Sequence, residues 1–199
     1  KSTDLDPENS LLHHYSTRRL QAESIRDSIL AVSGRLDRNL FGRPIEPHRV
    51  REHPRKRLFS GPRDGLGRRS IYLRVTMMEL PSFLTGFNFP DPKLSIGARD
   101  FTSVPAQALQ LLNDPLVAGQ AGHWAKQLFA DSSTSVAERI EGMFLRALGR
   151  EPEKRELERW QDAWKEFAGV DGDSSGKEEE AWKALAHAFF NTKEFIYYR

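Results

Sequence analysis

Three carboxylates in one turn-rich segment come closest to a pattern that does chemistry. Glu79, Asp91 and Asp100 stand near three phenylalanines, at positions 83, 87 and 89. A glycosidase needs one carboxyl group as acid and another as base or nucleophile, so these residues are candidates for a glycan site. Against this, three phenylalanines are more often a small satellite core, and Asp91 between two prolines is more often a turn former. The second interpretation is favoured, and no catalytic residue is assigned.

A second group of polar residues is predicted to share one face of a helix. Arg19, Glu23, Arg26 and Asp27 lie opposite an apolar stripe, and Arg19 and Glu23 are four residues apart. The group is either a set of exposed helical ion pairs or a docking face for another domain. Both interpretations stay open at this point.

The most basic stretch lies in the middle of the chain. Residues 43–74 hold ten Lys or Arg and only three acids, whereas residues 151–199 hold twelve acids and eight Lys or Arg. The two regions attract each other or face different partners. No recognition helix or stacking platform accompanies the cations, so an acidic protein neighbour is favoured over nucleic acid. We assign an interaction role to five of these cations: Arg55, Lys56, Arg57, Arg68 and Arg69.

Two loops imitate ligand-binding motifs. "SGPRDGLGRRS" is rich in glycine and basic, but its glycines lack P-loop spacing, so a flexible loop is favoured. "DGDSSGKEEEAW" places Asp171, Asp173, Ser175 and Gly176 as in the first half of a calcium-binding EF-hand loop. Trp182 then stands where the bidentate glutamate belongs, so an acidic interhelical loop is favoured. The six histidines show no metal-ligand spacing either, and no metal site is assigned.

Composition sets outer limits on the chemistry. The 199 residues contain no cysteine, which excludes a disulfide, a thiolate metal site and CxxCH haem attachment within this chain. No apolar run approaches the ~18 residues of a membrane span. Because the chain begins with Lys1, we expect a piece or processed product of a longer protein.

Helix signals dominate the pattern of the chain. We expect a short helix from Asp6, a longer one from Ser16 or Thr17 to Gly34, and a helical turn over 81–85. Further helices are expected over 105–112, from 115, from "STSV" to 149, over 152–169 and over 177–190, with a last turn in "NTKEFIYYR". Strands are expected over 56–60 and 70–76, and residues 37–69 read as a long basic loop.

These elements predict a mainly α fold. We expect a bundle of about five helices, completed by a small β element around Ile71–Val75 and the basic loop. The chain divides into N-terminal helices (1–36), a loop and turn-rich segment (37–100) and a helical bundle (101–199), all within one domain. "TSVPAQALQLLNDPLV" combines proline at a first helical position with capping residues, so it is interpreted as a helix entrance rather than the lip of a ligand site.

Six ordered stretches together resemble one known family. They are "DPENSLL" with "RRLQAESIRDSILAVSGRLD", "RRSIYLRV", "FNFPDP", "TSVPAQALQLLNDPLV", "FLRALGREP" and "AWKALAHAFFNTKEFIYYR". The chain resembles the planctomycete-specific domain of unknown function that lies C-terminal to cytochrome c-like segments in large exported proteins. The resemblance runs from about Asp6 to the end. A further stretch, usual in the family before the first block, is missing.

The resemblance implies an exported or periplasmic location and haem in a neighbouring module rather than in this chain. It carries no catalytic residues. Our main hypothesis is therefore a non-catalytic structural or interaction module that docks on upstream domains of its parent chain. The alternative is a glycan-acting enzyme or carbohydrate-binding domain that uses the loop carboxylates and aromatics.

Overall fold

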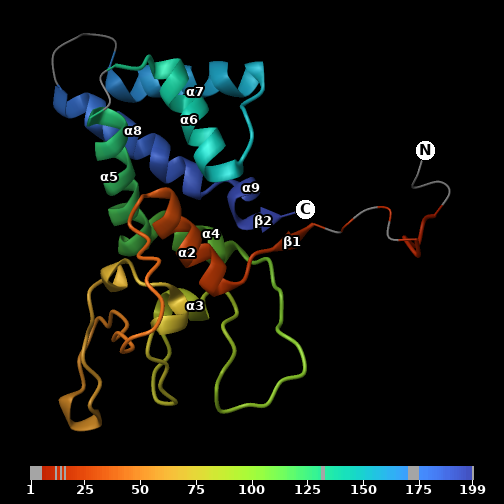
Figure 1. Ribbon diagram of the computed structural model, residues 1–199, viewed down its shortest axis with the longest axis vertical. Helices are drawn as coiled ribbons and strands as arrows, with labels where there is room; N and C mark the ends of the chain where they lie inside the picture. Colours follow the sequence, from red (N-terminus) through yellow and green to blue (C-terminus); the bar gives the residue numbers. More distant parts are fainter. Residues whose placement is uncertain are drawn as a thin grey trace.

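The computed structural model describes residues 6–11, 13, 15, 17–130, 133–169 and 175–198. Within them the chain is mainly α-helical, as predicted, with eight α-helices and one two-stranded antiparallel sheet. The number of helices exceeds the expected five, partly because the single turns α3 (Ser82–Thr85) and α9 (Lys193–Ile196) form helices of their own. Helices gather in the upper part of Figure 1 and long loops in the lower part.

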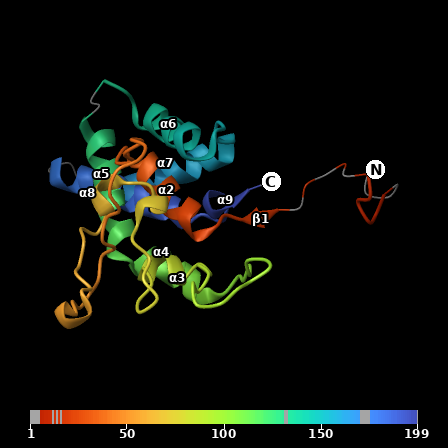
Figure 2. The ribbon, with the colours of Figure 1, turned by 60° about the horizontal axis from the view of Figure 1, so that its bottom comes forward.

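The N-terminal segment forms a strand where a helix was expected. Strand β1 (Arg18–Arg19) pairs with β2 (Tyr197–Tyr198), and helix α2 (Ala22–Val32) begins only after them. The backbone of residues 18–19 is engaged by the C-terminal strand, so Thr17 does not start the helix, and Ser16 lies outside the described residues. Residues 7–8 and 10–11 form turns rather than the expected short helix, and this arm lies away from the body (Figures 1 and 2).

The predicted strands of the middle segment do not form. Residues 70–72 are a 3₁₀ turn, η3 (Ser70–Tyr72), and the following Leu73 makes only an isolated bridge to Ile45. Ile45 is flanked by Pro44 and Glu46–Pro47, and because proline has no N–H donor, the ladder cannot grow. Over 56–60 the chain makes a single bridge between His53 and Leu58, beside the 3₁₀ turn η1 (Pro54–Lys56).

The helical body follows the local signals of the sequence closely. It consists of α4 (Pro105–Asn113), α5 (Pro115–Ala130), α6 (Val136–Leu148), α7 (Lys154–Ala168), α8 (Ser175–Phe190) and α9. Asp114 accepts a hydrogen bond from the Leu116 N–H at 2.8 Å and so caps α5. Ser135 caps α6, and Gly149 ends it with φ of 70°.

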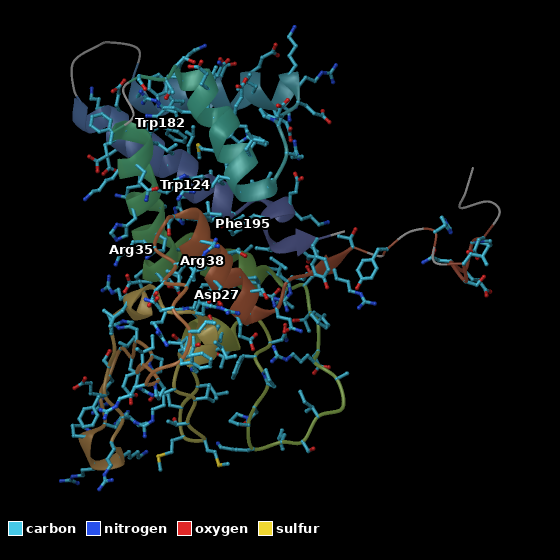
Figure 3. All side chains as sticks on the ribbon, in the orientation of Figure 1. Asp27, Arg35, Arg38, Trp124, Trp182 and Phe195 are labelled. Atoms are coloured by element: carbon cyan, nitrogen blue, oxygen red, sulfur yellow. The ribbon has the colours of Figure 1, made fainter. Side chains whose placement is uncertain are left out.

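The core is built around tryptophan and phenylalanine. Trp124 of α5 packs on Phe189 and Phe190 of α8, with ring centroids 5.7 and 5.4 Å apart, and Trp182 of α8 contacts Trp164 of α7. Figure 3 shows Trp124 and Trp182 in this upper part of the molecule. The same cluster includes Phe83 and Phe87. The three phenylalanines at positions 83, 87 and 89 therefore pack into or against the main core. Phe167, expected to face inward, is 53% exposed.

Residues 37–104 consist mainly of loops and lie below the helical body in the view of Figure 1. We call this part of the chain the loop layer. Its longest projection, residues 46–63, is called the stalk. In Figure 1 the stalk lies at the lower end of the molecule and helix α7 at the upper end. The basic and acidic regions of the sequence are thus held apart.

Candidate functional site

Arg26 is the hub that joins helix α2 to the loop layer. Its guanidinium is 3% exposed and donates to the backbone oxygens of Arg68 (2.9 Å) and Asp64 (2.8 Å) and to the Ser70 hydroxyl (3.1 Å). Burial lowers the pKa of Arg26, and the nearby Asp27 carboxylate partly offsets this. The side chain expected on an open docking face is therefore fully engaged inside the chain.

Asp27 and Arg35 extend this joint along α2. The Asp27 carboxylate accepts hydrogen bonds from the Ser70 N–H (2.8 Å) and hydroxyl (2.7 Å), and Arg35 pairs with Asp64 at 2.8 Å. Figure 3 shows Asp27 on the side of α2 that faces the loops. Burial of the Asp64 carboxylate acts to raise its pKa, but the hydrogen bonds from Arg35 and from the Leu66 N–H, with the Arg35 charge, together lower it.

The glycine-rich segment is docked rather than free, which corrects the expectation of a flexible loop. Gly65 and Gly67 are buried with φ of 61° and 74°. A Cβ on Gly67 would lie 2.0 Å from the backbone oxygen of Arg35. Only glycine allows this close approach, so these glycines serve packing against α2.

Arg19 forms a second joint, at the start of β1. It is 4% exposed and donates through Nη2 to the Asn88 side-chain oxygen (2.6 Å) and the Phe87 carbonyl (3.3 Å). Burial lowers the pKa of this guanidinium, and no carboxylate of the described residues pairs with it. The expected Arg19–Glu23 helical pair is wrong, because Glu23 instead binds Arg99 at 2.8 Å.

Several stretches that carry the family resemblance meet at this joint. The Asn88 Oδ1 atom also accepts from the Thr102 hydroxyl (2.9 Å) and Gln107 Nε2 (3.2 Å), while the Tyr197 hydroxyl donates to Ser103 at 3.1 Å. Residues from β1, "FNFPDP", "TSVPAQAL" and the C-terminal strand thereby form one network. "TSVPAQAL" is thus a helix entrance whose polar side chains tie the loop layer to both ends of the described chain.

Each candidate catalytic carboxylate has its own surroundings in the structure. Glu79 lies 3.5 Å from Arg49, Asp91 accepts from the Lys93 N–H of its own turn, and Asp100 is exposed. Within the described ranges, no group of three or more His, Cys, Asp or Glu is placed to hold a metal ion. Asp171 and Asp173 of the calcium-like loop fall outside these ranges, as do the side chains of Ser175 and Gly176.

The five assigned loop cations fall into two groups. Arg55, Lys56 and Arg57 are exposed at the tip of the stalk, and none of them makes an ion pair within the described part of the chain. Arg68 stacks on the Tyr72 ring at 3.9 Å, and Arg69 is exposed. Only the tip and Arg69 are available to a partner.

Arg49 is the residue of this region that sequence reasoning missed. It is 5% exposed, and its guanidinium donates to Glu46 (3.0 Å) and to the Phe59 carbonyl inside the stalk. Burial of the Glu46 carboxylate acts to raise its pKa, but hydrogen bonds from Arg74 and Arg49 lower it. No local signal distinguishes Arg49 from the exposed arginines around it. Its role depends on the fold of the stalk.

A cavity of about 210 Å³ lies where the stalk meets α3 and the start of α5. Its walls are mainly apolar and include Leu73, Phe83 and Leu116, while His48 and Arg63 also line it. Ligand pockets in proteins combine apolar walls with a few polar groups in this way. The volume is sufficient for one large side chain or a small molecule.

Comparison with protein families identifies the chain. The PSD1 family, described as "Protein of unknown function (DUF1553)", matches residues 1–164, which is most of the chain. The chain belongs to the PSD1 family. This confirms the expected domain of unknown function. The comparisons with curated proteins and with solved structures found no match.

Among the described residues, no helix is long and apolar enough to cross a bilayer.

Proposed function

We propose that this PSD1 chain is a non-catalytic interaction module of a larger exported protein, docked on upstream domains of its parent chain. The family's matched description supports a domain of unknown function. The resemblance of the sequence blocks to exported, cytochrome c-like proteins implies haem in a neighbouring module. Haem attachment through CxxCH would lie outside this chain, which has no cysteine.

The uneven distribution of exposed apolar side chains carries the proposal. Among the described residues, fifteen of twenty exposed large hydrophobic side chains fall within residues 40–112, which form the loop layer and α4. They include Phe41, Val50, Met77, Met78 and Phe101, of which Val50 is 100% exposed. Concentrated exposed apolar surface is typical of a face that another protein surface covers.

The charged residues of the same layer favour a protein partner. The hydrogen bonds of Arg26 and Asp27 to residues 64–70, together with the Arg35–Asp64 ion pair, fix these loops from within. The apolar and basic groups that point outward then form a pre-formed surface, which lowers the entropy cost of binding. The polar cluster of α2 contributes by holding this surface in place rather than by touching the partner.

Calorimetry with the separately expressed upstream portion of the parent protein tests the proposal. We expect binding, and we expect Met77→Ser with Met78→Ser and Phe101→Ser to weaken it about tenfold or more, since buried apolar anchors dominate such interfaces. Leu145→Ser with Phe167→Ser is the matched control, because both residues are exposed on the helical body. Absence of binding by the folded chain would contradict the proposal.

The glycan hypothesis is tested separately. A screen of glycans against the chain, with Glu79→Gln and Asp91→Asn as variants, measures hydrolysis and binding. Turnover that both variants abolish while the fold is retained would favour an enzyme over an interaction module.

A further inference from the structure

We propose that the basic stalk and the cavity at its base form one docking site for an acidic polypeptide segment that inserts an aromatic side chain into the cavity. This inference rests on the proposed interaction function and names the chemistry of the partner. Nothing in the family description assigns such a site.

The stalk is a braced structure and not a loose loop. The Gly61 N–H donates to the Pro47 carbonyl at 3.0 Å. The Ser60 hydroxyl accepts from the Arg49 N–H and donates to the Arg49 carbonyl, each at 2.9 Å. The buried Arg49 guanidinium fills the space between the two sides. A salt bridge of 2.6 Å between Glu46 and Arg74 fastens the stalk to the rest of the loop layer.

The braced stalk presents positive charge that the fold leaves unneutralised. Arg51, Arg55, Lys56, Arg57 and Arg63 are all exposed, and no ion pair joins any of them to another described residue. The stalk's two glutamates are already engaged, Glu46 by Arg49 and Arg74 and Glu52 by the Ser60 N–H at 2.7 Å. The outer surface of the stalk is therefore strongly cationic and complements a run of carboxylates.

The cavity supplies the apolar half of the site. It lies directly at the base of the stalk, between residues 47–50, residues 62–65, α3 and the first residues of α5. Val50, completely exposed, and the cationic Arg63 both line it. An apolar cavity of about 210 Å³ beside cations suits one aromatic ring flanked by carboxylates.

The same features disfavour nucleic acid. Phe41 and Phe59 are the exposed rings closest in sequence to the stalk cations, whereas single-stranded nucleic acid needs successive rings along a charged groove. The concave part of the site is apolar and holds a single side chain. A polypeptide supplies a single aromatic group between charges, and a polynucleotide does not.

Fluorescence anisotropy with defined peptides tests the proposal. The probe is a short labelled peptide with one tryptophan between pairs of glutamates, and the comparison peptide has alanine in place of tryptophan. We expect the tryptophan peptide to bind about tenfold more tightly, with affinity falling as salt rises from about 50 to about 200 mM. A labelled oligothymidylate of equal charge serves as the nucleic-acid arm.

Two pairs of variants assign the binding to the two halves of the site. Arg55→Ser, Lys56→Ser and Arg57→Ser together should weaken both peptides about tenfold, whereas Lys154→Ser, Arg155→Ser and Arg159→Ser remove equal charge from exposed positions of α7 and should not. Ser82→Phe, at an exposed position of the cavity lining, should remove the advantage of tryptophan, whereas the exposed Thr85→Phe, outside that lining, should preserve it.

Four results would overturn the inference: no binding of the tryptophan peptide, equal binding of both peptides, equal effects of the two triple variants, or tighter binding of the oligothymidylate. The proposed function fails in a different experiment. If the upstream portion binds but the stalk variants leave that binding unchanged, only the docking site is wrong. If the upstream portion does not bind, the interaction function is wrong whatever the peptides show.

Discussion

The buried guanidinium of Arg26 donates to the backbone carbonyl of Arg68 at 2.9 Å, across 42 positions of sequence. This contact places a helix and a glycine-rich loop against each other, and the other bonds of Arg26 reach Asp64 and Ser70 of the same loop. Arg26 is therefore one of the side chains that orient the loop layer on the body, together with Arg19 and Arg35.

Arg26→Met should destabilise the protein strongly. The change keeps an apolar stem but leaves two backbone carbonyls and a hydroxyl without their donor, so we expect a loss of about 3 kcal/mol in the free energy of unfolding. Denaturant unfolding followed by tryptophan fluorescence measures it. Arg38→Met, at an exposed position, is the control and should change stability by less than about 0.5 kcal/mol. A similar, small effect of both changes would show that Arg26 is not a hub.

Variants of Asn88 should separate its two roles. Its side-chain oxygen accepts from Arg19, Thr102 and Gln107, and its φ of 62° is left-handed. Asn88→Ala removes the acceptor and strains the backbone, so we expect the free energy of unfolding to fall by about 3 kcal/mol. Asn88→Gly removes only the acceptor, so the fall in the free energy of unfolding should be about 1 kcal/mol smaller. Asn88→Asp keeps the acceptor and adds a charge opposite Arg19, so it should retain stability at neutral pH. Thermal unfolding of the three variants gives the order, and equal Ala and Asp variants would contradict the role of the oxygen.

Gly61→Ala should release the stalk without unfolding the body. A Cβ at this position would lie 1.8 Å from the backbone oxygen of Glu46, which cannot move without opening the stalk. We expect faster tryptic cleavage at Arg55, Lys56 and Arg57, with unchanged far-ultraviolet circular dichroism. Gly97→Ala, where an added Cβ meets nothing within 4 Å, is the control. Cleavage at the same rate in both variants would mean that the stalk is already open in solution.

The clamp formed by Arg150 should make stability depend on pH. Arg150 binds Glu156 and Glu194 at 2.7–2.8 Å, and these bonds raise its own pKa. The hydrogen bond from Arg150 lowers the pKa of Glu156 from 4.5 to about 2. A depressed carboxyl pKa stabilises the folded state above pH 4.5, and this contribution is lost as pH falls from 4.5 toward 2.

Arg150→Ala should therefore lower the free energy of unfolding by about 1 kcal/mol at neutral pH. This value is small because the Arg150–Glu156 ion pair is partly exposed to solvent. The difference from the unaltered protein should shrink as pH falls below 4.5 and vanish near pH 2. Urea titrations across this range measure it. Lys165→Ala, which removes one exposed pair with Asp162, should show no such trend. A cost that stays constant with pH would mean that packing, and not charge, accounts for the effect.

The sequence by itself determined the helices of the body. Pro105, Asp114 before Pro115, Ser135 and Gly149 act through the backbone groups of their immediate neighbours. The starts of α4, α5 and α6 and the ends of α4 and α6 follow them. The apolar periods of α2 and α5 likewise identified core residues such as Ile25 and Trp124. The sequence alone also showed that the six histidines lack the spacing of metal ligands and that the chain contains no cysteine.

Only the tertiary structure decided where the strands lie and which charges are buried. β1 exists because the C-terminal residues Tyr197 and Tyr198 return to pair with it, a contact that no local pattern of the N-terminal segment encodes. Arg19 and Arg26 read as exposed cations, yet both are buried because residues far along the chain provide their acceptors. Arg49 is buried by the fold of the stalk, where Glu46 and Phe59 accept from it. Arginine is usually solvated, and the bonds that favour its burial depend on long-range geometry. The docking surface that we propose consists of the cations that this geometry leaves free.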